Sequence, residues 1–176
     1  ITKAEYLRWF QYISDMNSDV IRVYTTQAPV FYDALYEFNK TSKKPLYLLQ
    51  GVYLREDLIM KLDDAYGDHE AIKKDFIKST QELVDIFHGK AKLPERLGYA
   101  SGEYKSDISE YVIGWILGIE WDPMFVVGTI KHNSSKGGYN GKFLYTDKAS
   151  PFETFLCEVG DQVITYEAEK YKMMRP

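Results

Sequence analysis

An uncharged run from Tyr111 to Ile119 constrains the fold of this chain more than any other segment. The run is rich in β-branched and aromatic residues, as is typical of a buried strand. It leads directly into Glu120, and a turn that contains Pro123 follows. An unpaired carboxylate out of water is costly, whereas a cleft normally lies open at the carboxyl end of a parallel strand. We therefore predict a strand that ends on Glu120 and presents this carboxylate to a cleft.

Helical and strand patterns alternate along the rest of the chain. Capping boxes at Thr2–Glu5 and Ser150–Glu153 mark the starts of two helices, and apolar spacing extends the others. Residues 90–109 are expected to be a polar connection, and residues 124–149 a long loop with a strand at 124–129. The predicted order is a helix from 2, a strand over 20–24, a helix from 28, a strand over 45–53, a helix over 68–88, a strand over 111–120 and a helix over 150–172.

This alternation requires a parallel sheet with crossover helices, so the predicted fold class is α/β. Three or four strands are too few to close an eight-stranded TIM barrel, which takes about 250 residues. The chain is therefore either a small open α/β sheet or about half of a barrel. Its ends favour the half barrel, because the chain begins at Ile1 rather than at Met and stops at Pro176, a few residues after the last predicted helix. We expect residues 1–176 to be a single domain of parallel βα repeats that form part of a (β/α)8 barrel, from the first helix through the fourth.

Polar side chains lie near the carboxyl end of every predicted strand. They are Arg22 and Tyr24 in the first, Gln50 and Tyr53 in the second, and Glu120 in the third. Arg22 would be a charge within a buried strand and would need a carboxylate partner, for which Glu120 is a candidate. A site built on strand ends requires this convergence, although an internal salt bridge that fixes strand register would give the same pattern.

Composition excludes several classes of function. The net charge of −4 and the pI near 5.4 argue against a nucleic-acid partner, because phosphate backbones are bound by clustered Lys and Arg. A single cysteine, Cys157, excludes an internal disulfide and a metal site built from cysteines. The three histidines lack the spacing of metal ligands. Neither a metal nor another cofactor is therefore predicted. No apolar run approaches the roughly 18 residues of a membrane span. The 15% of aromatic residues indicates a large aromatic core or rings that stack on sugars.

Several segments together resemble a known family. Taken as a set, they make the chain similar to (β/α)8 glycoside hydrolases of the large retaining clan and, more narrowly, to bacterial glycosidase-like barrel proteins. The resemblance covers nearly the whole chain. It implies that Arg22 supports the site and that Glu120 is the general acid/base at the end of the fourth barrel strand. The segments that carry it are Ile21–Tyr24, Pro29–Tyr32, Pro45–Val52, Asp107–Ser109, Gly118–Trp121 and Ser150–Glu153.

The chain departs from the pattern of this clan in two ways. Asn usually precedes the acid/base, and Ile119 occupies that position here, so recognition of substrate hydroxyls is expected to differ. The nucleophilic carboxylate belongs on the seventh strand, which would lie in the remaining barrel half of the parent chain. The implied chemistry is hydrolysis of an oligo- or polysaccharide by two carboxyl groups, one protonating the leaving oxygen and the other attacking or activating water. A polysaccharide substrate would place the protein outside the cell or on its surface.

Other residues are predicted to bind the sugar. Trp121, Tyr53 and Tyr139 are candidate platforms for sugar rings, and His132 and Asn133 are candidate partners for hydroxyl groups. Tyr139 lies in the glycine-rich segment 137–141, which is equally typical of an ordinary turn. The predicted catalytic residue is Glu120, and the predicted substrate-binding residues are Arg22, Tyr24, Gln50, Tyr53, Trp121, His132, Asn133 and Tyr139.

Three functions remain open at this level. The first is a carbohydrate-active enzyme, of which this chain would be the amino-terminal half, inactive alone. The second is a non-catalytic carbohydrate-binding or scaffold module on a barrel-like fold. The third is an open α/β domain that binds a nucleotide or a partner protein, although no glycine-rich phosphate motif follows any strand. A half barrel would also expose strand edges and apolar faces, which predicts dimerisation or aggregation of the isolated chain.

Overall fold

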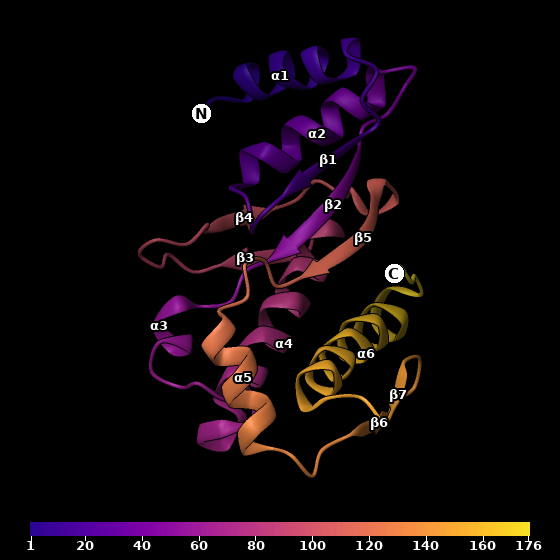
Figure 1. Ribbon diagram of the computed structural model, residues 1–176. Coiled ribbons are helices and arrows are strands. Elements are labelled where there is room, and N and C mark those ends of the chain that lie inside the picture. The colour runs from indigo at the N-terminus through magenta and orange to yellow at the C-terminus, as the bar shows by residue number, and fades with distance from the viewer. The chain divides into compact units, whose positions relative to one another are not determined.

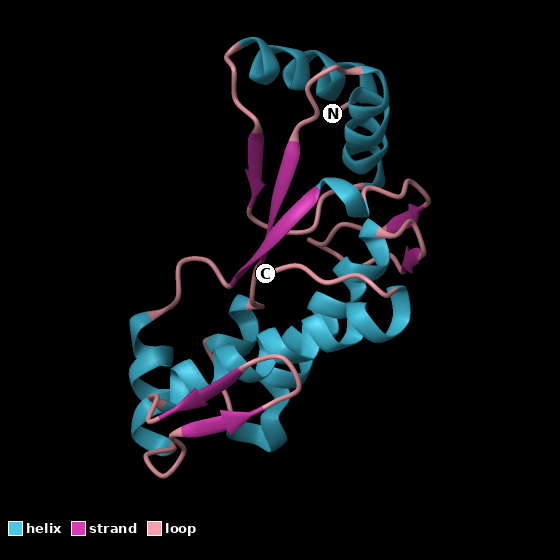
Figure 2. Cartoon of the chain, turned by 90° about the vertical axis from the view of Figure 1, so that its right-hand side faces the viewer, coloured by secondary structure: helices cyan, strands magenta, loops and turns pink.

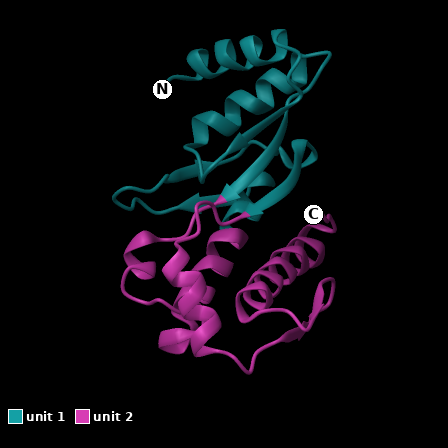
Figure 3. Cartoon of the chain, in the orientation of Figure 1, with its two compact units in different colours: residues 1–51, 82–116, 175–176 teal, residues 52–81, 117–174 magenta.

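The computed structural model describes residues 1–176, which divide into two compact units. Unit 1 comprises residues 1–51, 82–116 and 175–176, and unit 2 comprises residues 52–81 and 117–174 (Figure 3). The chain is mixed α/β with a three-stranded parallel sheet, so the α/β prediction is confirmed at that level. None of its helices combines the length and the apolar composition that crossing a membrane requires.

The sheet of unit 1 has the strand order β1-β2-β5 (Figure 1). Its strands are β1 (Val20–Val23), β2 (Tyr47–Val52) and β5 (Val112–Leu117), and the last residue of β2 and of β5 belongs to unit 2. Strand β1 pairs with β2 in a parallel register that places Val23 opposite Gln50. All three strands lie within the segments predicted to be strands from their β-branched and apolar patterns.

Helices α1 (Lys3–Asp15) and α2 (Pro29–Thr41) pack on each other in unit 1. The predicted capping box of α1 is confirmed, because the Thr2 amide donates to the Glu5 carboxylate at 2.8 Å and the Glu5 amide donates to the Thr2 hydroxyl. The contact is aromatic: the ring of Phe31 meets those of Tyr6 and Phe10 edge-on, at 5.4 and 5.6 Å between centroids.

The polar connection expected over residues 90–109 contains an antiparallel hairpin, which the sequence analysis did not predict. Strand β3 (Ala91–Leu93) pairs with β4 (Gly102–Tyr104), and the 3₁₀ turn η1 (Ser109–Tyr111) precedes β5. Tyr104 anchors the hairpin, since its ring lies 5.7 Å from that of Tyr32 and its hydroxyl donates to the Gln27 carbonyl at 3.0 Å.

The last two residues of the chain lie along the outer edge of β5 in unit 1. The Trp115 amide donates to the Pro176 carbonyl at 3.0 Å. The Arg175 guanidinium is buried and donates to the carbonyls of Ser109, at 2.8 Å, and Val112. The segment that follows the last helix therefore occupies the edge where the next strand of a parallel repeat would pair.

Unit 2 is built mainly from helices. They are α3 (Glu56–Ile59), most of α4 (Gly67–Phe87), α5 (Pro123–His132) and α6 (Pro151–Tyr171). A hairpin of β6 (Gly138–Asn140) and β7 (Tyr145–Asp147) packs beside α6 (Figures 1 and 2). The predicted capping box at Ser150 is confirmed, because the Ser150 amide donates to the Glu153 carboxylate at 2.7 Å.

Five aromatic rings form the core of unit 2. Trp121 stacks on Phe125 at 6.0 Å with an interplanar angle of 8°, and meets Phe152 edge-on at 5.0 Å. Phe76 of α4 and Phe155 of α6 complete the cluster, with centroids 6.0 Å apart. Much of the high aromatic content is therefore used for packing, in which such ring pairs are worth about 0.5–1.5 kcal/mol beyond area burial.

Two predicted elements of unit 2 were wrong in detail. Residues 124–129, predicted as a strand, lie in helix α5, because Asp122 caps the helix and Pro123 occupies its first turn. The Asp122 carboxylate accepts the Met124 and Phe125 amides at 2.8 and 3.0 Å, which is a strong start signal. In α4, residues 68–70 have positive φ, so the regular helix begins after Glu70 rather than at Asp68.

The turn of the β6–β7 hairpin is organised by one buried carboxylate, that of Asp161 on α6. It accepts the Tyr139 hydroxyl at 3.0 Å and the Phe143 and Leu144 amides at 2.7 and 2.9 Å. Burial raises the pKa of Asp161, but these bonds to the ionised form outweigh burial and hold the pKa below its ordinary value. The ionised carboxylate thus accepts hydrogen bonds from backbone amides that have no other partner within the turn.

Candidate functional site

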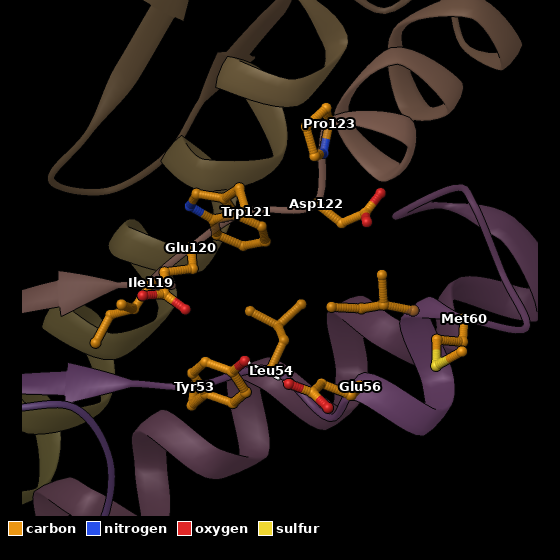
Figure 4. A pocket seen from close by; sticks show the side chains of 10 residues that line it. Tyr53, Leu54, Glu56, Met60, Ile119, Glu120, Trp121, Asp122 and Pro123 are labelled. Carbon is orange, nitrogen blue, oxygen red and sulfur yellow. Dashed lines mark hydrogen bonds between the residues drawn. The ribbon is translucent and has the colours of Figure 1, made fainter.

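A pocket of about 450 Å³ lies within unit 2 (Figure 4). Its size falls in the range of small-molecule sites, about 300–1,000 Å³. One wall comes from the segment after β2 and from α3, and the facing wall comes from the segment that joins β5 to α5. The lining residues are Tyr53, Leu54, Glu56, Ile59 and Met60 on the first wall, and Ile119, Glu120, Trp121, Asp122 and Pro123 on the second.

The predicted strand over residues 111–120 extends three residues too far at its carboxyl end. Strand β5 ends at Leu117, because Gly118 adopts a φ of +73° and its amide donates to the Val52 carbonyl at 2.9 Å. Glu120 then has a φ of +54°. A non-glycine residue in this left-handed region is disfavoured by about 1–2 kcal/mol, and strain of this kind gathers at functional sites. Glu120 is therefore presented by a strained bend and not by a strand.

Trp121 dictates the glycine at position 118. A Cβ atom on Gly118 would lie 2.0 Å from Cζ2 of the Trp121 ring, which no side chain can tolerate. The indole is half-buried, with its ring against Phe125 and Phe152 and part of its surface in the pocket wall. The Gly118–Trp121 segment therefore fixes the indole as a rigid wall beside Glu120.

Three carboxylates line the pocket, and their partners differ. Glu56 accepts a hydrogen bond from the Tyr53 hydroxyl at 2.6 Å, and Asp122 caps α5. The carboxylate of Glu120 is exposed and has no hydrogen bond or ion pair within unit 2. Glu120 projects from the wall that contains Trp121, and Glu56 and Tyr53 lie on the facing wall (Figure 4).

Three predicted substrate-binding residues belong to unit 1. Arg22 was expected to be buried and to need a carboxylate, but it is exposed, and its guanidinium lies over the Tyr24 ring at 4.8 Å from the centroid. The expectation of burial was wrong because β1 is a short strand with no fully buried residue. Gln50 is fully buried, accepts from the Tyr32 hydroxyl at 3.1 Å and donates to the Gly51 carbonyl.

Three other predicted residues lie in unit 2 but do not line the pocket. Asn133 follows α5 and donates to the Asp64 carboxylate at 2.7 Å, which ties the loop before α4 to the end of α5. His132 is exposed with its Nε2 3.6 Å from a carboxylate oxygen of Asp63. The Tyr139 hydroxyl, on the β6–β7 hairpin, donates a hydrogen bond to the Asp161 carboxylate of α6. The structure thus brings Tyr53, Glu120 and Trp121 together in the pocket. It places His132, Asn133 and Tyr139 outside the pocket lining.

The sequence analysis missed Glu56 and Met60 on the α3 wall, and Asp122 opposite. Glu56 and Met60 closely follow Tyr53 in the sequence, and Tyr53 was predicted to bind substrate. Extending the predicted site beyond Tyr53 along the chain would therefore have included them. Asp122 carries the Asp-Pro signature of a helix start. No group of His, Cys, Asp or Glu residues in the chain has a geometry that could hold a metal ion.

A second polar cluster in unit 2 joins α4 to α6. Glu158 accepts the Tyr66 hydroxyl at 2.9 Å and the Lys73 ammonium at 2.6 Å, and Lys73 also pairs with Glu70 at 2.9 Å. Burial and the hydrogen bond to Glu158 raise the pKa of Tyr66. Its members satisfy one another, so this cluster serves to hold two helices together.

Comparison with known protein families, curated proteins and solved structures gives no match to this chain. The resemblance to glycoside hydrolases therefore stays a prediction, and the pocket must be interpreted from its own residues.

Proposed function

We propose that the pocket of unit 2 is a carbohydrate-active site in which Glu120 is the general acid/base for cleavage of a glycosidic bond. One observation carries the proposal. Glu120 is the pocket carboxylate without a partner in its unit, and a strained backbone holds it beside the rigid Trp121 ring. A free carboxyl group can act as a general acid, and an aromatic face beside it suits the apolar side of a sugar ring.

In the proposed reaction, the Glu120 carboxyl group gives its proton to the glycosidic oxygen as the bond between that oxygen and the anomeric carbon breaks. A second carboxylate attacks the anomeric carbon, or activates a water that does so. Trp121 and Tyr53 supply aromatic faces for the apolar side of the sugar ring. The resemblance assigns the second carboxylate to the seventh strand of a complete barrel.

We further propose that the chain forms part of a (β/α)8 barrel as a single domain whose remaining half lies in the parent protein. Two features support the proposal. The strands follow one another as parallel neighbours in the order β1-β2-β5, as barrel strands do. The segment after α6 lies at the outer edge of β5, through the bond between Trp115 and Pro176.

The alternative is a non-catalytic carbohydrate-binding or scaffold module. The exposure of Glu120 favours it, because the acid of a glycosidase normally lies in an apolar pocket that favours the protonated form. In this case the pocket would bind an oligosaccharide and leave it intact.

Hydrolysis of a panel of aryl-glycosides by the full-length protein separates the two functions. We expect the wild type to release the aryl alcohol and Glu120→Gln to lose at least 100-fold in rate, since general acid catalysis contributes about 10²–10⁴-fold. Asp147→Asn, which removes an exposed carboxylate on β7 outside the pocket, is the matched control. Unchanged turnover in Glu120→Gln would remove Glu120 from the role. Sugar binding without hydrolysis would establish the binding module.

A further inference from the structure

We infer that the sugar taken by this pocket carries a positively charged amino group, as an oligosaccharide of unacetylated hexosamine does. The inference rests on the proposed function and deepens it by assigning the charge of the substrate. It follows from which charges line the pocket and from where they lie.

All ionisable groups that line the pocket, apart from the Tyr53 phenol, are carboxylates. Glu56, Glu120 and Asp122 contribute negative charge, and no lysine, arginine or histidine is among the lining residues. Arg55 precedes Glu56 in the chain, but its guanidinium pairs with Asp57 at 2.6 Å and approaches Asp75 at 3.8 Å. The lining therefore carries no positive charge of its own to balance the carboxylates. Such a pocket favours a cation and repels phosphorylated or acidic sugars.

The two glutamates lie on facing walls, so a ligand in the pocket lies between two carboxylates (Figure 4). The Tyr53 hydroxyl bonds to Oε1 of Glu56 and leaves Oε2 open to a ligand. A primary ammonium offers three donors, which suits acceptors in different directions. The rings of Tyr53 and Trp121 would also attract a cation through their faces.

The rest of the lining shows that the ligand is an organic cation and not a metal ion. Leu54, Ile59, Met60, Ile119 and Pro123 make up half of the lining residues. A metal ion needs several oxygen ligands converging at about 2.0–2.6 Å, and no such cluster is present. A sugar ring has an apolar face as well as polar substituents, so an aminosugar matches both the apolar and the carboxylate parts of the wall.

The test is calorimetric titration of the full-length protein, at low salt and pH 6, with two tetrasaccharides that differ at one substituent per ring. One is the β-1,4-linked glucosamine tetramer, and the other is cellotetraose, in which a hydroxyl replaces each amino group. We expect the amino sugar to bind at least tenfold more tightly. Glu56→Gln should reduce its affinity by about tenfold, because it removes one charge contact that solvent partly screens, and leave cellotetraose binding unchanged.

Two further arms isolate the role of charge. The N-acetylated tetramer, which has lost the positive charge, should bind no better than cellotetraose. Glu103→Gln, which removes an exposed carboxylate of β4 in unit 1, should leave all affinities unchanged. Raising the salt concentration should weaken the amino sugar selectively, because ions screen exposed charges.

The failures of the inference and of the proposed function give different results. Equal affinity for the amino and neutral tetramers overturns the inference and leaves a sugar site. Absence of binding by all three tetramers refutes the proposed function and the inference together. Tight binding of the amino sugar that persists in both Glu56→Gln and Glu120→Gln places the cation elsewhere and overturns the inference. Thermal melting of each variant shows that loss of binding does not arise from loss of fold.

Discussion

The strained backbone at Glu120 leads to a prediction that separates stability from function. Replacing Glu120 with Gly relieves a φ of +54°, while replacing it with Ala keeps the strain. The side chain itself contributes little to the folded state, because it is exposed and has no hydrogen bond or ion pair within its unit. The difference between the two variants therefore isolates the backbone.

The magnitude follows from two opposing effects. An L-residue in the left-handed region is disfavoured by about 1–2 kcal/mol. Glycine loses part of this gain, because its greater freedom in the unfolded chain costs about 0.4–1 kcal/mol relative to Ala. Glu120→Gly should thus be more stable than Glu120→Ala by about 1 kcal/mol. In sugar binding or hydrolysis both variants should be equally deficient, because both lack the carboxylate.

Urea unfolding followed by circular dichroism measures this difference. With an m value of about 2 kcal/mol/M, a stability difference of about 1 kcal/mol separates the two midpoints by about 0.5 M. The matched control is Glu95, an exposed loop residue that is not among those with positive φ. There the Gly variant should be the less stable of the two. A Glu120→Gly midpoint equal to or below that of Glu120→Ala, at equal m, would refute the argument from strain.

Three further substitutions test the elements that hold the site. Gly118→Ala should destabilise the folded protein by more than 2 kcal/mol and shift the fluorescence of Trp121. The control is Gly98→Ala, which has a similar φ but nothing within 4 Å of the added Cβ, and it should cost only about 1 kcal/mol of stability. Equal losses of stability in thermal melts of the two variants would contradict the steric argument. Ser150→Ala should remove about 1 kcal/mol by loss of the α6 cap, and an unchanged urea midpoint would show that the capping box is dispensable. Because hydrogen bonds outweigh burial and lower the pKa of Asp161, its stabilisation is present above the unfolded-state pKa near 4 and is lost as pH falls through the lowered folded-state pKa. Asp161→Asn should therefore lose about 1–3 kcal/mol at pH 7 and show a flatter acid limb, and a stability profile parallel to that of the wild type would refute this.

The elements that were predicted correctly carry strong local signals. The capping boxes at Thr2 and Ser150 are visible from residue types three positions apart, and the β-branched runs of β1, β2 and β5 have few alternatives. The hairpins β3–β4 and β6–β7 were missed because each strand has only three residues. A segment of that length shows no reliable periodicity, and its pairing depends on contacts distant in sequence, such as those of Asp161 and Tyr104.

The segment around Glu120 shows why the end of a strand is harder to predict than its existence. The uncharged run continues through Ile119, so composition alone extends the strand too far. Strand β5 ends at Leu117 because Gly118 adopts a positive φ, and the Trp121 ring that excludes any side chain from that position comes close to it only in the folded chain. Helix α5 was missed for the opposite reason: the local Asp122-Pro123 signal was present, but the apolar run after it was interpreted as a strand.

The position of the pocket nevertheless follows from topology. Strands β2 and β5 are neighbours in a parallel sheet, so the segments that leave their carboxyl ends must start side by side. The bond from the Gly118 amide to the Val52 carbonyl, within unit 2, shows that they do. These segments supply the two facing walls and so bring Tyr53 and Glu56 opposite Glu120 and Trp121. The argument from strand ends therefore located the pocket although it misplaced the end of the strand, because strand order determines which segments meet.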